Sequence, residues 1–160
     1  SAIISVSFFL AGPLSVLFAG HVSDKIFNSR RLPYCIIALF LLAIILFFFN
    51  DIAVLQNKIV IALLLFIIGF LLYGPDSLVS ATAALDFGTS KGASTASGLI
   101  NGLGSIGAIV GGTVPGFFKE SWGWGGVFAF LAGSVLIASV IMIPKWSAIP
   151  INNNNKLNEK

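Results

Sequence analysis

The stretch LFLLAIILFFF occupies residues 39–49 and contains no charged or polar side chain. It lies within a longer apolar run from Pro33 to Asn50, which approaches the length of about 20 residues that a helix needs to cross a bilayer. Four further apolar runs of similar length cover residues 1–20, 59–79, 95–118 and 124–144. The sequence therefore predicts an all-α bundle of about five transmembrane helices.

The composition supports a lipid environment. Of the 160 residues, 57% are hydrophobic and 9% are charged, whereas about a quarter of the residues in a soluble domain are charged. Five apolar runs of this length would leave too little polar surface for a bundle in water. The lipid bilayer is therefore the expected partner of the outer surface, and a water-soluble helical protein is excluded.

The basic residues test the order of the spans. Connections 21–33 and 80–94, together with the residues after 144, hold seven of them: Lys25, Arg30, Arg31, Lys91, Lys145, Lys156 and Lys160. Connections 51–58 and 119–123 hold only Lys58 and Lys119. Loops rich in Lys and Arg remain in the cytoplasm. We therefore predict that the first set and the C-terminus are cytoplasmic.

This pattern also divides the chain. Residues 1–144 are expected to form part of a transmembrane domain, and residues 145–160 a polar, disordered cytoplasmic tail. The sequence begins at Ser1 inside an apolar run, and the number of spans is odd. Both observations predict that the chain is one piece of a larger fold.

The connection after the first span has the sequence GHVSDKIFNSRR, residues 20–31. We interpret it as an electrostatic latch. Gly20 would permit close helix approach, while Asp24 would cap a neighbouring helix end and pair with Arg30 or Arg31 in one conformation only. Lys25 adds a further positive charge. A plain basic loop that only sets orientation is the alternative.

This connection resembles the loop motif of the major facilitator superfamily, G-x-x-x-D-[RK] followed by a basic pair. In that family the motif lies on the cytoplasmic side, after the second and the eighth helices. Four apolar runs follow the motif here. The resemblance therefore implies that the chain contains helices eight to twelve of a twelve-helix transporter.

Two later spans contain polar residues. Tyr73-Gly74-Pro75-Asp76 interrupts the third span, where proline is expected to kink the helix. Asp76 is a candidate for a gate or cavity, or simply reaches the interface; Tyr73 is a candidate substrate contact or an interfacial residue. In the fourth span, Asn101 and Ser105 share a helix face as cavity or interhelical residues.

Seven glycines accompany that polar pair. Small residues spaced four apart let helix backbones approach closely in lipid, so we expect this helix to pack against neighbours. The glycines lie between the start of the fourth span and its end: Gly98, Gly102, Gly104, Gly107, Gly111, Gly112 and Gly116.

The stretches 73–75, 84–87, 91–98 and 101–108 are similar to the tenth-to-eleventh helix region of the organophosphate:phosphate antiporters. The resemblance implies exchange of a sugar phosphate or glycerol 3-phosphate for inorganic phosphate, in a bacterial inner membrane. It also implies that arginines from the first and seventh helices hold the phosphate, so the partners include the N-terminal helices of the same transporter. Phe9 stands where some members have a carboxylate.

Other classes of function have little support. His21 and Cys35 are single residues of their types, so no metal cluster, catalytic triad or cofactor site is expected. No glycine-rich phosphate loop and no large basic face are present, so we expect neither an enzyme nor a nucleic-acid partner. The alternatives are a facilitator for another solute, a sugar-phosphate sensor with the same fold, or an inactive fragment.

Overall fold

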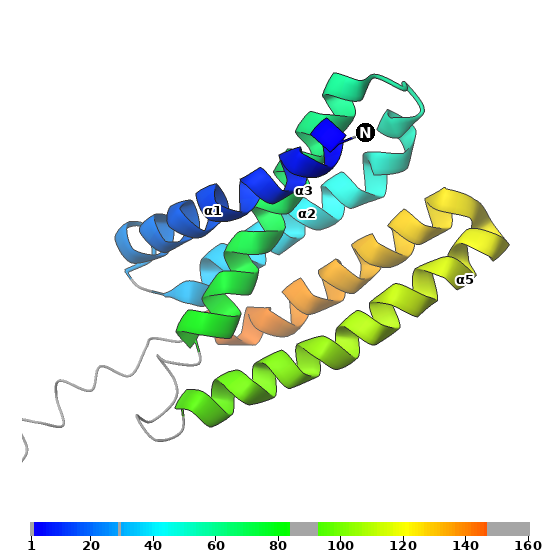
Figure 1. Ribbon diagram of the computed structural model, residues 1–160. Helices are drawn as coiled ribbons and strands as arrows, with labels where there is room; N and C mark the ends of the chain where they lie inside the picture. The colour runs from blue at the N-terminus through cyan, green and yellow to red at the C-terminus, as the bar shows by residue number, and fades with distance from the viewer. Residues whose placement is uncertain (1, 29, 84–92, 147–160) are drawn as a thin grey trace, which may run out of the picture.

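The computed structural model describes residues 2–28, 30–83 and 93–146, and in these ranges every regular element is helical (Figure 1). The predicted all-α membrane bundle is confirmed. The elements are α1 (Ala2–Lys25), α2 (Arg31–Ala53), α3 (Lys58–Ser77), η1 (Leu78–Ala83), α5 (Ala93–Met142) and η2 (Ile143–Lys145). The predicted polar tail, apart from residues 145 and 146, lies outside the described residues.

Four of the described helices are long and apolar enough to cross a membrane, and the last of them, α5, covers 50 residues. That helix reverses at Gly123, which has φ 68° and ψ −166°. Only glycine adopts this backbone conformation without strain. Figure 1 shows two arms of α5 side by side, residues 93–122 (first arm) and 124–142 (second arm). The reversal lies within the connection predicted at 119–123 and divides α5 into two arms, so the described residues form five long helical segments.

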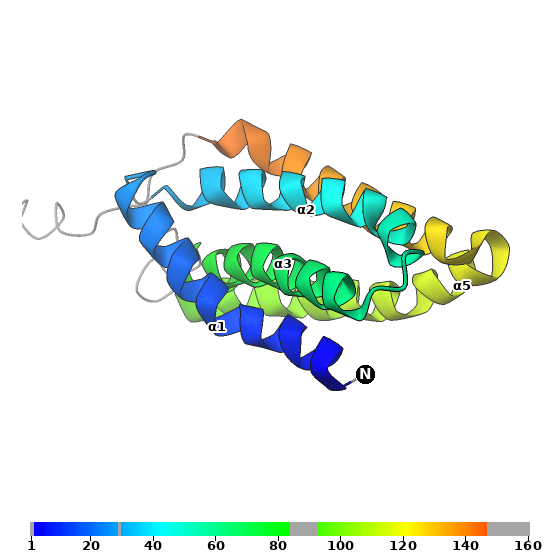
Figure 2. The ribbon, with the colours of Figure 1, turned by 90° about the horizontal axis from the view of Figure 1, so that it is seen from above.

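Apolar side chains of the stretch 39–49 contribute to the core between α2 and the second arm of α5. These two helical segments lie side by side in Figure 2. The buried side chains there come from three helices: Leu39, Leu42, Leu46, Phe49, Ile68 and Ala132. A buried hydrogen bond from Ser139 Oγ to the Ile36 carbonyl, 3.2 Å, joins the same two helices. Hydrogen bonds of this kind support helix association in lipid.

Small residues bring α1 and α3 together. Ala11, Ser15, Ala19 and Ser23 are four residues apart on α1, and each has an exposed fraction of 0%. Ser15 Oγ donates a hydrogen bond to the Phe70 carbonyl of α3. In lipid, close approach of backbones at small residues supplies the packing that drives association. This stripe was not recognised in the sequence analysis.

Glycines of α3 complete this contact. A Cβ at Gly69 would lie 2.7 Å from the Phe8 carbonyl oxygen. A Cβ at Gly74 would lie 2.8 Å from Ser15 Oγ and from the Tyr34 hydroxyl. Any side chain at these positions would therefore push the helices apart. Pro75 is buried beside them inside α3, and the helix continues as the wider π-helix η1.

The glycine-rich first arm of α5 differs from expectation. A Cβ at any of its seven predicted contact glycines would meet no heavy atom of the described chain within 4 Å. The expected close packing is therefore wrong for this chain by itself. Among the described residues, α1 packs mainly on α3 and α2 on α5, and no helix comes within 4 Å of the Cβ positions of these glycines.

The predicted alternation of charge agrees with the fold. Among the described residues, Lys25, Arg30, Arg31 and Lys145 lie at the end of the bundle that holds the α1–α2 connection, here called the latch end. Lys58 and Lys119 lie at the opposite end, which holds the α2–α3 connection and the Gly123 reversal. Lys119 Nζ lies 4.8 Å from the centre of a Trp124 ring.

The α1–α3 contact predicts the effect of a single methyl group. Gly69→Ala should destabilise the helical fold by about 1–3 kcal/mol, because the new Cβ would overlap the backbone of α1. The measurement is thermal unfolding of the detergent-solubilised polypeptide that carries this chain, followed by tryptophan fluorescence.

Gly133→Ala is the matched control, because a Cβ there meets no described atom within 4 Å. Alanine favours a helix over glycine by up to about 1 kcal/mol, so this variant should be as stable as the original or slightly more. Equal destabilisation by both changes would contradict the assigned contact.

Candidate functional site

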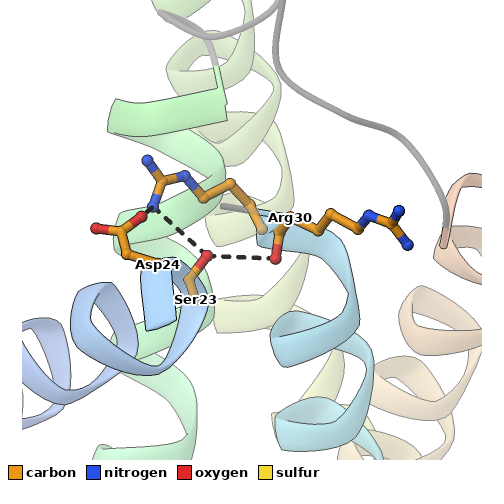
Figure 3. A network of polar contacts seen from close by, with 4 residues as sticks. Ser23, Asp24 and Arg30 are labelled. Atoms are coloured by element: carbon orange, nitrogen blue, oxygen red, sulfur yellow. Dashed lines mark hydrogen bonds and ion pairs between the residues drawn. The ribbon is translucent and has the colours of Figure 1, made fainter. Parts of the chain in front are cut away.

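The α1–α2 connection places the predicted latch residues at a sharp corner. Helix α1 ends at Lys25 and α2 begins at Arg31, with Asn28 at φ 50° between them. Arg31 Nη1 lies 2.7 Å from Asp24 Oδ1 and forms an ion pair with it (Figure 3). The pair therefore joins the last turn of one helix to the first residue of the next.

Ser23 extends this network. Its hydroxyl donates to the Arg30 carbonyl at 3.2 Å and accepts a hydrogen bond from Arg31 Nη1 at 3.4 Å. Figure 3 shows the Arg30 side chain directed away from Asp24. Of the two arginines considered from sequence, Arg31 is the one that pairs with Asp24. Ser23 was missed, although it precedes Asp24 within the same motif.

The ion pair has a mixed environment. The exposed fraction of the side chain is 14% for Arg31 and 55% for Asp24. An ion pair with an exposed partner typically contributes about 0.2–1 kcal/mol to stability. Lys25 is exposed, and a Cβ at Gly20 would meet no described heavy atom within 4 Å. No neighbouring helix in the described chain therefore uses the space that Gly20 leaves.

A second cluster lies where the end of α3 faces the first arm of α5. Asp76, Asn101 and Ser105, predicted separately, line one groove of about 390 Å³. The other lining residues are mostly small or apolar: Val79, Ser80, Ile100, Gly104 and Ala108. None of the described residues lining this groove is basic. The structure thus brings three of the four cavity candidates together.

Tyr73 lies elsewhere. Its ring packs against Phe8, with the ring centres 5.4 Å apart, and its Cδ2 lies 3.5 Å from the Cβ position of Gly12. Tyr73 therefore contributes to the α1–α3 contact, and it is absent from the described lining of the groove.

Two serine hydroxyls in the groove donate to backbone carbonyls four residues earlier in the chain. Ser80 Oγ donates to the Asp76 carbonyl at 2.6 Å, and Ser105 Oγ donates to the Asn101 carbonyl at 2.9 Å. Ser80 was not selected from sequence. Ser80 lies four residues after Asp76, a spacing that places the two residues on one helix face. This spacing is the sequence pattern that could have identified Ser80.

Metal and phosphate chemistry can be checked for the described residues. They contain no group of three His, Cys, Asp or Glu side chains placed to hold a metal ion. Their basic side chains lie at the helix ends, with Lys25, Arg30, Arg31 and Lys145 at the latch end. A dianionic phosphate is best held by arginine, whose planar group donates two parallel hydrogen bonds. The described spans offer no such group midway along a helix.

Comparison with known proteins adds independent information. The sequence profile described as the Major Facilitator Superfamily matches residues 1–157. No solved structure matches the chain.

Several curated proteins are similar to the chain over most of its length. A "Probable hexose phosphate transport protein" of Chlamydia pneumoniae is 35% identical over 151 residues, which are 93% of this chain and 32% of that protein. The "Glycerol-3-phosphate transporter" of Bacillus subtilis is 32% identical over 147 residues, 88% of this chain and 32% of the relative. A "Glucose-6-phosphate exchanger" of Mus musculus is 32% identical over 147 residues, 87% of this chain and 28% of the relative.

The chain thus spans about a third of the length of these relatives. The relatives agree with the resemblance to organophosphate transporters drawn from the sequence, and the apolar helices are those of an integral membrane protein. The match over residues 1–157 covers almost the whole sequence. The chain therefore belongs to the Major Facilitator Superfamily.

Proposed function

We propose that the protein carrying this chain is a secondary transporter that exchanges a sugar phosphate or glycerol 3-phosphate for inorganic phosphate. The single observation that supports this most is the similarity, over 87–93% of the chain, to proteins named as hexose phosphate, glycerol-3-phosphate and glucose-6-phosphate transporters or exchangers. Transport, with no covalent change to the solute, also suits a chain whose polar groups line a groove between membrane helices.

In this proposal the chain contributes helices eight to twelve, and other helices of the same transporter hold the phosphate. Two halves of the protein would rock about a central site and expose it alternately to each side. The latch end, with its excess of Lys and Arg, would face the cytoplasm of a bacterial cell from the inner membrane, and the C-terminus would lie on the same side.

Reconstitution tests the transport function. The complete polypeptide in phosphate-loaded vesicles should take up labelled glucose 6-phosphate or glycerol 3-phosphate, and each molecule taken up should release phosphate. Empty vesicles should show little uptake, because an exchanger needs a solute to return. Binding of sugar phosphate with no exchange would favour the sensor, and exchange of unphosphorylated solutes alone would favour a different facilitator.

The corner between α1 and α2 suits a conformational latch. Arg31 is largely buried, while Asp24 remains accessible, so the carboxylate can change partner only at the cost of leaving the Arg31 charge without this partner. The pair joins α1 to α2, so a change in the angle between these two helices during the rocking motion would change the distance between the two charges. We therefore propose that the Asp24–Arg31 pair stabilises one of the two transporter conformations.

Removal of the Asp24 charge tests this role. Asp24→Asn should slow exchange by up to about fivefold, which corresponds to the upper value of about 1 kcal/mol for a partly exposed ion pair. The half-saturating concentration of substrate should change less than about twofold, since the latch lies away from the groove. Exchange kinetics and equilibrium substrate binding provide the two measurements.

The two arginines supply a matched control. Arg31→Gln should slow exchange as Asp24→Asn does, and the double variant should be no slower than either single one, because both changes remove one interaction. Arg30→Gln should have the smaller effect, because its side chain points away from Asp24. A parallel loss of binding with unchanged turnover, or equal effects of both arginine changes, would contradict the latch.

A further inference from the structure

The groove between the end of α3 and the first arm of α5 has an unusual balance of hydrogen-bonding groups. The carboxylate of Asp76 accepts hydrogen bonds in its ionised form and donates none. Ser80 and Ser105 have already used their hydroxyl protons on the carbonyls of Asp76 and Asn101. Each serine oxygen can therefore only accept a hydrogen bond from a further partner, such as a bound solute. Of the described polar side chains in the groove, only Asn101 retains N–H donors.

This balance selects between the two ends of a phosphorylated solute. Phosphate oxygens are strong acceptors that need donors or cations. The groove offers mainly acceptors, and the negative charge of Asp76 would repel a dianion. Sugar hydroxyls, in contrast, donate one hydrogen bond each and also accept. Asp76 and the two serine oxygens can receive these bonds, and the Asn101 amide can both give and receive.

The groove extends from the latch end of the bundle along the first arm of α5. Its lining on the first arm runs from Ile100 to Ala108, whereas the helix begins at Ala93. At about 1.5 Å per residue, the lining covers about 10–22 Å from that helix end. The hydrocarbon core is about 30 Å thick, so the first-arm side of the groove extends from the latch end toward the middle of the span, while Asp76 lies one residue before the end of α3 at Ser77. Substrates of transporters with this architecture bind near the midplane.

We propose that this groove is the subsite for the hydroxyl-bearing end of the substrate, with Asp76 as its main acceptor and Asn101 beside it. This inference rests on the proposed exchange function and adds which residues of the chain would receive the hydroxyl groups of the phosphate ester. The phosphate group then lies outside the groove, toward helices other than α3 and α5.

The decisive experiment compares two exchange reactions of the complete protein in vesicles. Asp76→Asn keeps the shape of the side chain, replaces one acceptor with a donor and removes the charge. It should raise the half-saturating concentration of glucose 6-phosphate by about tenfold or more, as expected for the loss of a hydrogen bond to a charged group. Exchange of inorganic phosphate for inorganic phosphate should change by less than about threefold.

Two further variants sharpen the result. Asn101→Leu replaces the amide with an apolar side chain of similar size. It should also raise the half-saturating concentration of glucose 6-phosphate more than that of inorganic phosphate. Asp51→Asn is the control, because Asp51 is an exposed carboxylate of α2 at the end opposite the latch and outside the described groove lining. It should leave both reactions unchanged.

Other outcomes would overturn the subsite. Equal loss of both reactions in Asp76→Asn would place the carboxylate in the transport cycle itself, and a simultaneous loss of pH dependence would identify it as a proton carrier. No change in either reaction would remove the groove from the substrate path.

Direct binding separates this inference from the proposed function. If the unaltered protein exchanges neither solute, binding of glucose 6-phosphate and of inorganic phosphate is measured by the shift in thermal unfolding. If Asp76→Asn then weakens binding of glucose 6-phosphate but not of inorganic phosphate, the subsite is supported although the proposed exchange function is not. Absence of binding by the unaltered protein would overturn both.

Discussion

The close contact between α1 and α3 positions both candidate sites of this chain. Its basis is steric: Ala11, Ser15 and Ala19 are completely buried against α3, and a single Cβ at Gly69 would overlap the backbone of α1. In lipid there is no water to expel between helices, so such packing and the hydrogen bond from Ser15 must hold the pair. Helix α1 ends in the Asp24–Arg31 pair, and α3 ends at the groove with Asp76. One contact thus orients the ends of two helices.

Much of the fold could be predicted because the membrane imposes a length and forbids charge. An apolar run such as residues 39–49 can only be a span or a buried core, and the basic connections then assign each end to a side. The helix partners were harder to predict. The glycines of the first arm of α5 formed the most obvious small-residue pattern, yet the described chain gives them no neighbour. The contact that forms uses single glycines of α3 and a mixed alanine–serine stripe of α1.

The candidate sites show the same limit. Local spacing was sufficient to predict the Asp24–Arg31 ion pair and the shared helix face of Asn101 and Ser105, because these relations lie within one connection or one helix. Spacing could not indicate that Asp76 faces that pair, since this depends on the angle between α3 and the first arm of α5. Nor could it separate Tyr73 from Asp76, which are three residues apart but belong to the α1 contact and to the groove, respectively. The π-helix η1 begins directly after this segment and changes the helical register there.

In the proposed transporter, charge would divide substrate binding between this chain and the other helices. The described spans place their basic residues at the ends, and a carboxylate, Asp76, lines the groove, so in our proposal they would bind hydroxyl groups and not the phosphate. A transporter for a phosphate ester must nevertheless hold a dianion inside a medium that penalises charge, which requires cationic partners close to it. If these partners belong to the other helices, the two ends of the substrate lie on different halves of the protein. The two halves can then enclose the whole solute only when both ends are present. Such an arrangement would couple recognition of the ester to the rocking motion.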